Sequence, residues 1–394
     1  MIASTTSLVA PARMLVVDDN EMNRDVLTRR LQRCGHAVEA VADGELALAR
    51  LRGQAFDLVL LDVMMPGIDG YEVLARIKED AALRHLPVIM ITALGEADSV
   101  IRCIELGADD YLTKPFNPLI LQARVDASLL KKRAHDGELR HLRDMEREFE
   151  IGRAIQRGFL PESTPQHAGW ELATRFRPAR QVAGDFYDLF NVSTGHLAIV
   201  VADVCDKGVG AALYMALFRT LIRATASQPY RRETEPASIL IAAAAVTNNY
   251  IASVHGRANM FATVFLALLD PASGALLYIN AGHEPPLICG AGGIRQRLAL
   301  TGPALGLLPE QRFSVGQAQL HPGELLLGYT DGVTEATGAA GEFGEARLHA
   351  LLATPGESAE ALLLAVEQAL DRHGDGAEPM DDVTLVACRR SSLA

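Results

Sequence analysis

The sequence predicts a multidomain chain in which a doubly wound α/β domain is followed by a helical linker and an α+β domain. Three observations lead to this prediction. The chain has 394 residues, well above the roughly 150 of one ordinary domain. In residues 13–130, short apolar runs alternate with amphipathic segments. In residues 160–394, strand-like runs follow one another as in hairpins, and the alanine-rich helices lie between groups of strands. Residues 131–159, between them, are rich in charge. Residues 1–12 are expected to be a disordered N-terminus.

Composition narrows the class of function. The net charge of −12 counts against an extended nucleic-acid surface, which needs basic patches. The five cysteines include no CxxC pair, and the N-terminus has no basic start followed by an apolar core, so we expect a cytoplasmic chain with reduced thiols. The longest uncharged stretch, residues 236–256, is interrupted by Asn248 and Asn249, which favours a buried helix over a membrane span.

The first domain is predicted to consist of alternating strands and helices. Short apolar runs predict strands at 14–17, 37–41, 57–61, 87–91 and 110–113, and amphipathic segments such as 22–35 and 70–80 predict helices between them. This alternation is typical of a parallel sheet with helices on both faces. Ligands of such sheets gather beyond the carboxyl ends of the strands.

Chemically active side chains follow four of these strands. Asp18 and Asp19 come after the first, Asp62 after the third, Thr92 ends the fourth and Lys114 follows the fifth. Any one of them alone reads as a turn or cap residue. Three carboxylates at one sheet edge repel one another and need a cation such as Mg²⁺, and a lysine with a hydroxyl beside them suits a phosphoryl group.

These motifs, "VVDDN", "LLDVMMPGIDGYE", "MITA" and "DYLTKPF", resemble the receiver domain of two-component response regulators, which has a flavodoxin-like fold. The resemblance implies that Asp62 accepts a phosphoryl group from a sensor histidine kinase or phosphotransfer protein in a phosphorelay. It also implies roles for other residues. Magnesium would be held by Asp19, Asp62, the backbone carbonyl of Met64 and, through water, Asp18. Phosphoryl contacts would come from Thr92 and Lys114, and Tyr111 would be the aromatic residue that changes position.

The linker region, 119–159, is expected to be one extended helix. Apolar residues spaced by three or four lie along one side of it, namely Leu139, Leu142, Met145 and Phe149. The heptads are imperfect, and two glycines weaken the helix. The segment is either a solvated helix between domains or a short parallel coiled coil that would join two copies in a homodimer.

The second domain carries acids in four separated segments: "QVAGDFYDLF" with Asp185 and Asp188, "AIVVADVCDKG" with Asp203, "ELLLGYTDGVTEA" with Asp331, and "MDDVTLVAC" with Asp381 and Asp382. One acid at a strand end is usually a turn residue. A set of them can meet at one edge of a sandwich and bind hard cations that share and activate a water. A calcium loop would hold its acids in one short segment, and a phosphate-binding loop would place its lysine after the glycines.

The motifs "RAIQRGFLP", "GDFYD", "NAGHEPPL", "YTDGVTEA" and "DDVTL" resemble the PPM family of metal-dependent serine/threonine protein phosphatases, in its bacterial SpoIIE/RsbU-like branch. The resemblance implies a four-layer αββα sandwich with two Mn²⁺ or Mg²⁺ ions. Asp185 and Asp203 would sit at the shared position with the backbone carbonyl of Val204, and Asp331 and Asp381 would complete the other metal site.

The chain departs from the family in the loop after Asp203, which has no histidine to act as a general acid; Asp206 there either tunes a water or repels substrate. His283 is either catalytic or a structural hydrogen-bonding residue. Three arginines are candidates to hold the substrate phosphate: Arg175, Arg177 and Arg180.

The sequence as a whole predicts a response regulator whose phosphorylation at Asp62 controls a protein phosphatase. By analogy with the family, the substrate is a phosphorylated anti-sigma-factor antagonist in a partner-switching pathway. An alternative is a phosphorylation-controlled binding module with an inactive phosphatase-like domain, although the four metal acids count against it. A DNA-binding output is disfavoured by the acidic charge.

Overall fold

The computed structural model describes residues 10–93, 97–231, 233–339, 341–353, 356–376 and 379–392, with the side chains of 97–99 left out. Most of the N-terminal segment expected to be disordered lies outside these residues. The chain divides into two compact units, and the division falls between Met145 and Glu146.

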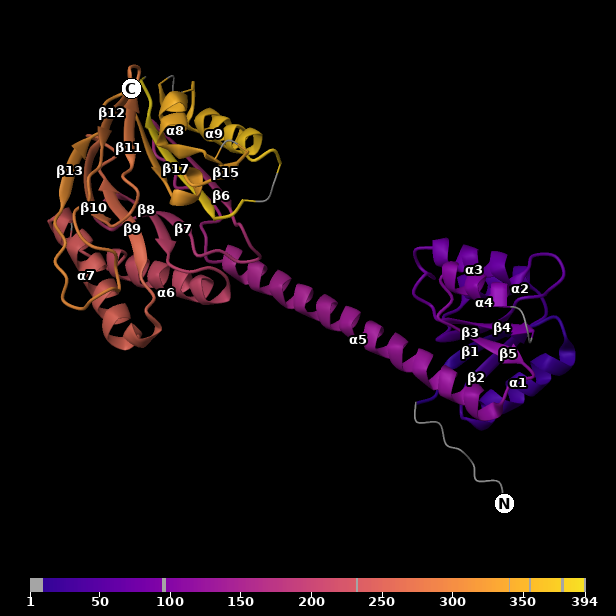
Figure 1. Cartoon of the computed structure of the whole chain (residues 1–394). Coiled ribbons are helices and arrows are strands. Elements are labelled where there is room, and N and C mark those ends of the chain that lie inside the picture. The colour runs from indigo at the N-terminus through magenta and orange to yellow at the C-terminus, as the bar shows by residue number, and fades with distance from the viewer. Residues whose placement is uncertain are drawn as a thin grey trace. The chain divides into compact units, whose positions relative to one another are not determined.

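The first unit is a five-stranded parallel sheet with helices on both faces, so the predicted doubly wound fold is confirmed (Figure 1). The strand order is β2-β1-β3-β4-β5. The strands are β1 (Arg13–Val17), β2 (Ala37–Val41), β3 (Leu58–Asp62), β4 (Val88–Ala93) and β5 (Asp110–Lys114). The helices are α1 (Glu21–Arg33), α2 (Gly44–Gly53), α3 (Gly70–Glu79) and α4 (Ala97–Glu105).

Each face of this sheet has its own apolar core. Alternate strand residues point to opposite faces, so neighbours such as Val16 and Val17 belong to different cores. One core is closed by α2, α3 and α4, and the other by α1 and the first turns of α5 (Pro118–Arg157). Because these strands run parallel, the carboxyl ends of β1, β3, β4 and β5 lie at one edge of the sheet.

Helix α5 is 40 residues long and changes character along its length. Its first turns bury Leu121, Val125 and Leu129 against the sheet. Farther on, Leu142 is 50% exposed and Met145 is 40% exposed. The predicted linker helix is therefore present, and part of its apolar stripe is open to solvent within one chain.

The second unit contains two five-stranded sheets in which neighbouring strands run antiparallel. The first has the order β13-β10-β9-β8-β7 and the second β12-β11-β14-β17-β6. The first sheet comprises β7 (Phe186–Asn191), β8 (Leu197–Val204), β9 (Ala262–Leu269), β10 (Ala275–Ala281) and β13 (Gly316–Gln319). The second comprises β6 (Trp170–Arg177), β11 (Leu287–Gly290), β12 (Gly293–Arg297), β14 (Leu325–Tyr329) and β17 (Val383–Arg390).

Helices cover the outer face of each sheet, which confirms the predicted α+β sandwich (Figure 1). Helices α6 (Val209–Ala226) and α7 (Pro236–Val254) share a core with the first sheet. Helices α8 (Gly344–Leu352) and α9 (Ala359–His373) share a core with the second. A 3₁₀ turn, η2 (Asp331–Val333), follows β14, and two short strands, β15 (Thr337–Gly338) and β16 (Gly341–Glu342), form a small hairpin.

Two helices, α6 and α7, are long and apolar enough to cross a membrane by length and composition alone. Both contribute side chains to the core of the sandwich: Met215 and Phe218 come from α6, and Ile239 and Ile251 from α7. Core packing therefore accounts for the apolar residues on the buried side of each helix, whereas Leu213 and Val254 are exposed.

Candidate functional sites

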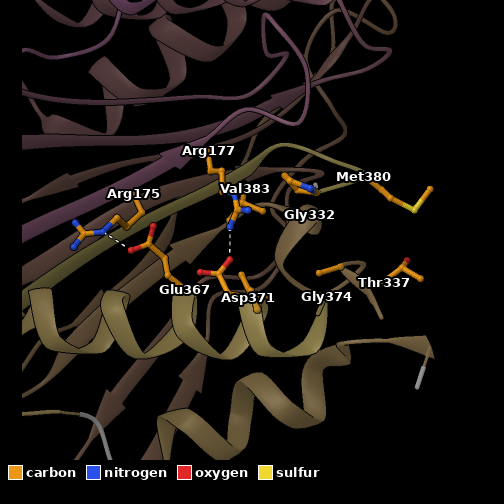
Figure 2. A pocket seen from close by; sticks show the side chains of 12 residues that line it. Arg175, Arg177, Gly332, Thr337, Glu367, Asp371, Gly374, Met380 and Val383 are labelled. Atoms are coloured by element: carbon orange, nitrogen blue, oxygen red, sulfur yellow. Dashed lines mark hydrogen bonds and ion pairs between the residues drawn. The ribbon is translucent and has the colours of Figure 1, made fainter. Parts of the chain in front are cut away.

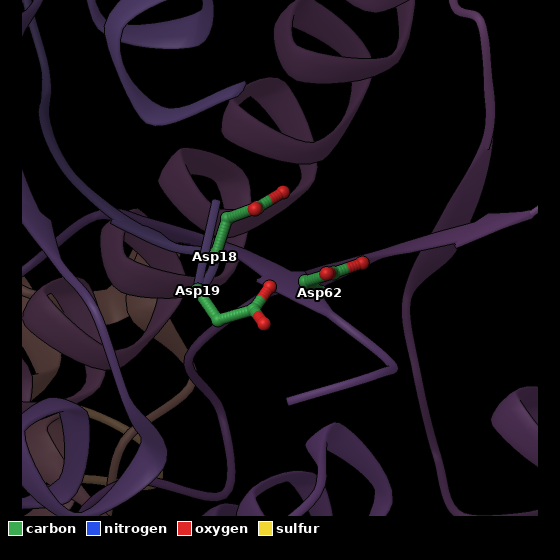
Figure 3. Close-up of side chains that lie close together, drawn as sticks. All are labelled: Asp18, Asp19 and Asp62. Carbon is green, nitrogen blue, oxygen red and sulfur yellow. The ribbon is translucent and has the colours of Figure 1, made fainter. Parts of the chain in front are cut away.

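The first candidate site lies at the carboxyl edge of the parallel sheet (Figure 3). Asp18 follows β1 and is fully buried, Asp62 ends β3 and is buried, and Asp19 is exposed. One ligand oxygen from each of these three acids lies within 4.8 Å of the other two. An all-oxygen set of this spacing fits a hard cation such as Mg²⁺.

Lys114, at the end of β5, joins two of these acids. Its Nζ lies 3.0 Å from Asp18 Oδ2 and 2.9 Å from Asp62 Oδ1. Burial raises the pKa of Asp62, and the carboxylates of Asp18 and Asp19 add to this, whereas Lys114 opposes it. Burial disfavours the charged lysine, but its hydrogen bonds to Asp62 and Asp18 outweigh this and raise the pKa of Lys114. Thr92, buried near the end of β4, follows Ile91, the residue paired with Asp62 in the sheet.

Tyr111 on β5 is half-buried and contacts the long helix. Its ring centroid lies 5.2 Å from the guanidinium carbon of Arg124 on α5, and the same guanidinium forms an ion pair with Asp110. The last strand and α5 are therefore joined by a cation–π contact and a charge pair. The Met64 side chain is 69% exposed, and its backbone carbonyl lies two residues beyond Asp62.

The second candidate site gathers acids from both sheets of the sandwich. Asp185 directly precedes β7, Asp203 lies near the end of β8, Asp331 opens η2 and Asp381 lies two residues before β17. Asp185 is buried, and its Oδ2 accepts hydrogen bonds of 2.7 Å from the hydroxyls of both Thr330 and Thr384. The Asp185 carboxylate is thus oriented by two residues of the second sheet.

Burial and neighbouring carboxylates both act on the pKa values of the acids in this cluster. Burial raises the pKa of Asp203 to about 7, and the carboxylates of Asp331 and Asp381 contribute to the rise. Burial and Asp381 raise the pKa of Asp331 to about 6. The pKa of Asp185 is raised well above its ordinary value by burial and by the carboxylates of Asp203 and Asp382.

The donor set fits the divalent metals that the family resemblance implies. It consists of carboxylate oxygens together with the Val204 backbone carbonyl, which are ligands that Mg²⁺ and Mn²⁺ take. Gly184 leaves room beside that carbonyl, because a Cβ at 184 would lie only 2.8 Å from the Val204 oxygen. Within the described residues, only the Asp18, Asp19 and Asp62 set brings three ligand atoms within 4.8 Å, so the acids of the sandwich form a wider cluster.

Asp382 and Gln156 have positioning roles that the sequence did not indicate. The Asp382 carboxylate accepts hydrogen bonds from the backbone N–H groups of Ala179 at 2.8 Å and Gly184 at 2.7 Å. The buried Gln156 side chain of α5 donates to the Ala183 carbonyl at 2.7 Å and accepts from the Ala183 N–H at 2.9 Å. Together they hold the loop that leads into Asp185. The "DD" pair was a signal for Asp382, but no local pattern marks Gln156.

Two of the three candidate phosphate arginines are held by acids of α9 (Figure 2). Arg175 lies 2.6 Å from Glu367 and also pairs with Glu360. Arg177 lies 2.5 Å from Asp371. Both arginines line the small pocket between α9 and the second sheet. Arg180, an exposed residue, lines a second pocket beside the Asp185 loop, and Arg177 lines this pocket as well.

The remaining polar residues singled out in the sequence have separate surroundings. His283 is buried, its Nδ1 lies 2.9 Å from Thr263 Oγ1, and burial lowers its pKa to about 3, as for a neutral structural histidine. Asp188 is buried and pairs with two arginines of α6, Arg219 at 3.1 Å and Arg223 at 2.6 Å. Asp188 therefore anchors α6 to β7.

Lys207 belongs to the loop that follows Asp203. Its ammonium lies 2.7 Å from Asp381 Oδ2 and donates to the Met380 carbonyl at 3.0 Å. It is the one residue to form an ion pair with Asp185, Asp203, Asp331 or Asp381 in the described part of the chain. The preceding residue, Asp206, has a left-handed backbone with φ of 72° and is exposed.

Comparisons with known proteins agree with this architecture. Residues 14–126 match the family model described as response regulator receiver domain. Transcriptional regulatory protein TcrA of Mycobacterium tuberculosis is 47% identical over 119 residues, which cover 30% of this chain and 46% of that protein. Protein IcfG of Synechocystis sp. is 38% identical over 318 residues, covering 76% of this chain and 49% of that protein. The chain thus spans about half the length of these two curated relatives.

The sandwich has its own matches. The solved SiaA-PP2C domain of Pseudomonas aeruginosa superposes with a TM-score of 0.54 at 20% identity, covering 63% of this chain and 98% of that one, which shows a shared fold. Residues 193–391 match the family model described as Stage II sporulation protein E (SpoIIE). Since this match extends over half of the residues, the chain belongs to the SpoIIE family of PPM-type phosphatases, with a response-regulator receiver domain preceding the SpoIIE domain.

Proposed function

We propose that this chain is a response regulator in which phosphorylation of Asp62 controls a metal-dependent protein serine/threonine phosphatase. The observation that carries the proposal is the convergence of Asp185, Asp203, Asp331 and Asp381 from four separated segments, in one chain with a receiver domain. Burial and neighbouring carboxylates raise the pKa values of Asp185, Asp203 and Asp331, and such a cluster is unfavourable without a cation to neutralise it, so a structural role alone does not account for it.

In the receiver domain, Asp62 is the proposed phosphoacceptor. A carboxylate oxygen of Asp62 forms the new bond to phosphorus while the bond from phosphorus to the donor histidine nitrogen breaks. Asp18, Asp19, Asp62 and the Met64 carbonyl would hold Mg²⁺, which supplies positive charge for the phosphoryl oxygens. Lys114 already contacts Asp62, so it is placed to pair with the transferred group, and Thr92 is the proposed hydroxyl contact.

In the phosphatase domain, Asp185, Asp203, the Val204 carbonyl, Asp331 and Asp381 would hold two Mn²⁺ or Mg²⁺ ions, which lower the pKa of bound water and so supply a nucleophile. The chain's own polar residues keep these ligands in place. Thr330 and Thr384 orient the Asp185 carboxylate by hydrogen bonds. Asp382 fixes the backbone on both sides of residues 180–183.

The proposed substrate is a phosphoserine or phosphothreonine on an anti-sigma-factor antagonist, in a cytoplasmic partner-switching pathway. A sensor histidine kinase or phosphotransfer protein is the proposed donor for Asp62. The support for these partners is the resemblance of the two domains to their families. The alternative, a binding module with an inactive phosphatase-like domain, is disfavoured because all four acids remain in one cluster.

Hydrolysis of p-nitrophenyl phosphate by the full chain, measured with Mn²⁺ and with EDTA, tests the proposed activity. We expect turnover that requires the metal and returns when Mn²⁺ is added back, because the nucleophilic water depends on it. Phosphorylated anti-sigma-factor antagonists are then assayed for release of phosphate. Equal hydrolysis in Mn²⁺ and in EDTA would contradict the proposal, and absence of hydrolysis in both would favour the binding module.

Control of the phosphatase by the receiver is proposed to run through α5. Tyr111 and Asp110 on the last receiver strand contact Arg124 of α5, and at the other end of the helix Gln156 holds Ala183 beside Asp185. A phosphoryl group that draws in Thr92 and Lys114 biases the packing of Tyr111 and so the face beside α5. The partly exposed stripe from Leu139 to Phe149 would then pair with a second chain in parallel.

Beryllofluoride, a mimic of the phosphoryl group, is expected to strengthen dimerisation and change phosphatase turnover severalfold, with activation favoured. Sedimentation velocity and phosphate release measure the two effects. Leu142→Glu places a charge on the stripe and should abolish the effect of beryllofluoride on both dimerisation and turnover while both domains stay folded. Glu138→Gln, at an exposed residue of the same helix, should leave both effects unchanged. Unchanged sedimentation and turnover with beryllofluoride would exclude this route of control.

A further inference from the structure

A pocket of about 280 Å³ beside the Asp185 loop has an unusual charge for this acidic chain. Its lining contains three arginines, Arg153, Arg177 and Arg180, and no carboxylate from the described residues. The other lining residues are Pro178, Ala179, Gln181 and Pro379. Guanidinium groups converging on a polar pocket favour an anion, since each offers several N–H donors in a planar array.

The three arginines have hydrogen-bonding capacity to spare. Among the described residues, Arg153 and Arg180 form no ion pair. Arg153 Nε donates to the Gln181 carbonyl at 3.0 Å, which aims the side chain along the pocket wall and involves none of its terminal nitrogens. Arg177 pairs with Asp371, but both side chains are about half exposed, and such surface pairs contribute little.

The backbone around the pocket is held in place before any ligand arrives. The Asp382 carboxylate accepts hydrogen bonds from the backbone N–H groups of Ala179 and Gly184. The Gln156 side chain accepts one from the Ala183 N–H, and Arg153 donates to the Gln181 carbonyl. Four contacts within six residues leave this loop little freedom, so binding there costs little conformational entropy. The pocket is therefore organised in advance for a ligand.

The pocket is distinct from the metal-ligand cluster but lies next to it. None of the four proposed metal acids lines it, and the loop from Ala179 to Gly184 leads directly from its lining to Asp185. On the other side, Pro379 is two residues from Asp381. The phosphoryl group that is hydrolysed must contact the metal-activated water, so this pocket, which none of those acids lines, suits a second anionic group of the same substrate.

We propose that this pocket binds an acidic side chain of the phosphoprotein substrate, close in sequence to the phosphorylated residue. The inference rests on the proposed phosphatase function and adds a specificity site to it. The three arginines give an acidic substrate residue a position of complementary charge. Among the described residues, the lining has no aromatic side chain on which a nucleotide base would stack, which favours a carboxylate as the occupant.

Fluorescence anisotropy of labelled phosphoserine peptides tests this proposal. The full chain carrying Asp203→Asn is used so that the peptide is not consumed. A peptide with three aspartates beside the phosphoserine is expected to bind about tenfold more tightly than the same peptide with asparagines, a ratio typical of one charge-assisted hydrogen bond. Arg153→Gln retains a donor for the Gln181 carbonyl but removes the charge, and is expected to reduce the ratio to about twofold or less.

Arg147→Gln is the matched control, because Arg147 is an exposed arginine of the same helix outside the pocket lining, and it should keep the full preference. Equal binding of the two peptides, or an unchanged preference in Arg153→Gln, overturns the proposal. The anisotropy measurement reports peptide binding and does not require phosphatase turnover. Failure of the phosphatase function is instead seen as lack of metal-dependent p-nitrophenyl phosphate hydrolysis by the unmodified chain.

Discussion

Asp203→Asn is expected to lower phosphatase turnover more than about a hundredfold, because loss of even an outer-shell partner of a metal site commonly costs about 10–100-fold. Asp203 is proposed to be shared by both metal positions, and its carboxylate interacts with those of Asp185, Asp331 and Asp381. Release of phosphate from p-nitrophenyl phosphate in saturating Mn²⁺ measures the effect. Full activity in this variant would remove Asp203 from the proposed ligand set.

The same variant should remain folded, which separates loss of chemistry from loss of structure. The pKa of Asp203 is raised to about 7 in the folded chain, so its ionised form opposes folding above that pH. In EDTA at pH 8, Asp203→Asn should therefore unfold at the same temperature as the unmodified chain or higher, as judged by circular dichroism. Asp375→Asn, at an exposed acid with a left-handed backbone that asparagine tolerates, is the control and should retain turnover.

Asp62→Ala is expected to abolish phosphoryl transfer to the receiver domain. Incubation of the full chain with acetyl phosphate and Mg²⁺ should add one phosphoryl group, seen in the intact mass. Asp62 is the buried acid that Lys114 contacts at the end of β3, so its removal deletes the proposed attacking oxygen. Unchanged labelling of Asp62→Ala would show that the phosphoacceptor is elsewhere.

Asp18→Ala provides the comparison for that experiment. Asp18 lies in the same acid cluster and also contacts Lys114, but its proposed role is to support Mg²⁺ through water. Its removal should slow labelling without preventing it, because Asp62 still offers its oxygen. A complete block in Asp18→Ala with normal labelling of Asp62→Ala would reverse the two proposed roles.

The local sequence determined much of the secondary structure and the positions of the acids. Short continuous apolar runs that end in acids predicted the strands at Asp18, Asp62 and Asp203, since a buried strand stops where a carboxylate must reach solvent or a cation. The alanine-rich segments predicted α6 and α7 within the sandwich. The strands, the helices and the positions of the acids can be predicted because each depends on residues that are close together in the sequence.

The tertiary structure decided which distant groups meet. The hydrogen bonds from Thr330 and Thr384 to Asp185 join residues 145 and 199 positions apart, and they exist because the two sheets pack face to face. Likewise, acids of α9 reach Arg175 and Arg177 only because that helix covers the second sheet, and Arg153 reaches Gln181 only because α5 ends beside the Asp185 loop. Side-chain contacts of this kind depend on the packing of whole elements, which no local pattern of residues specifies.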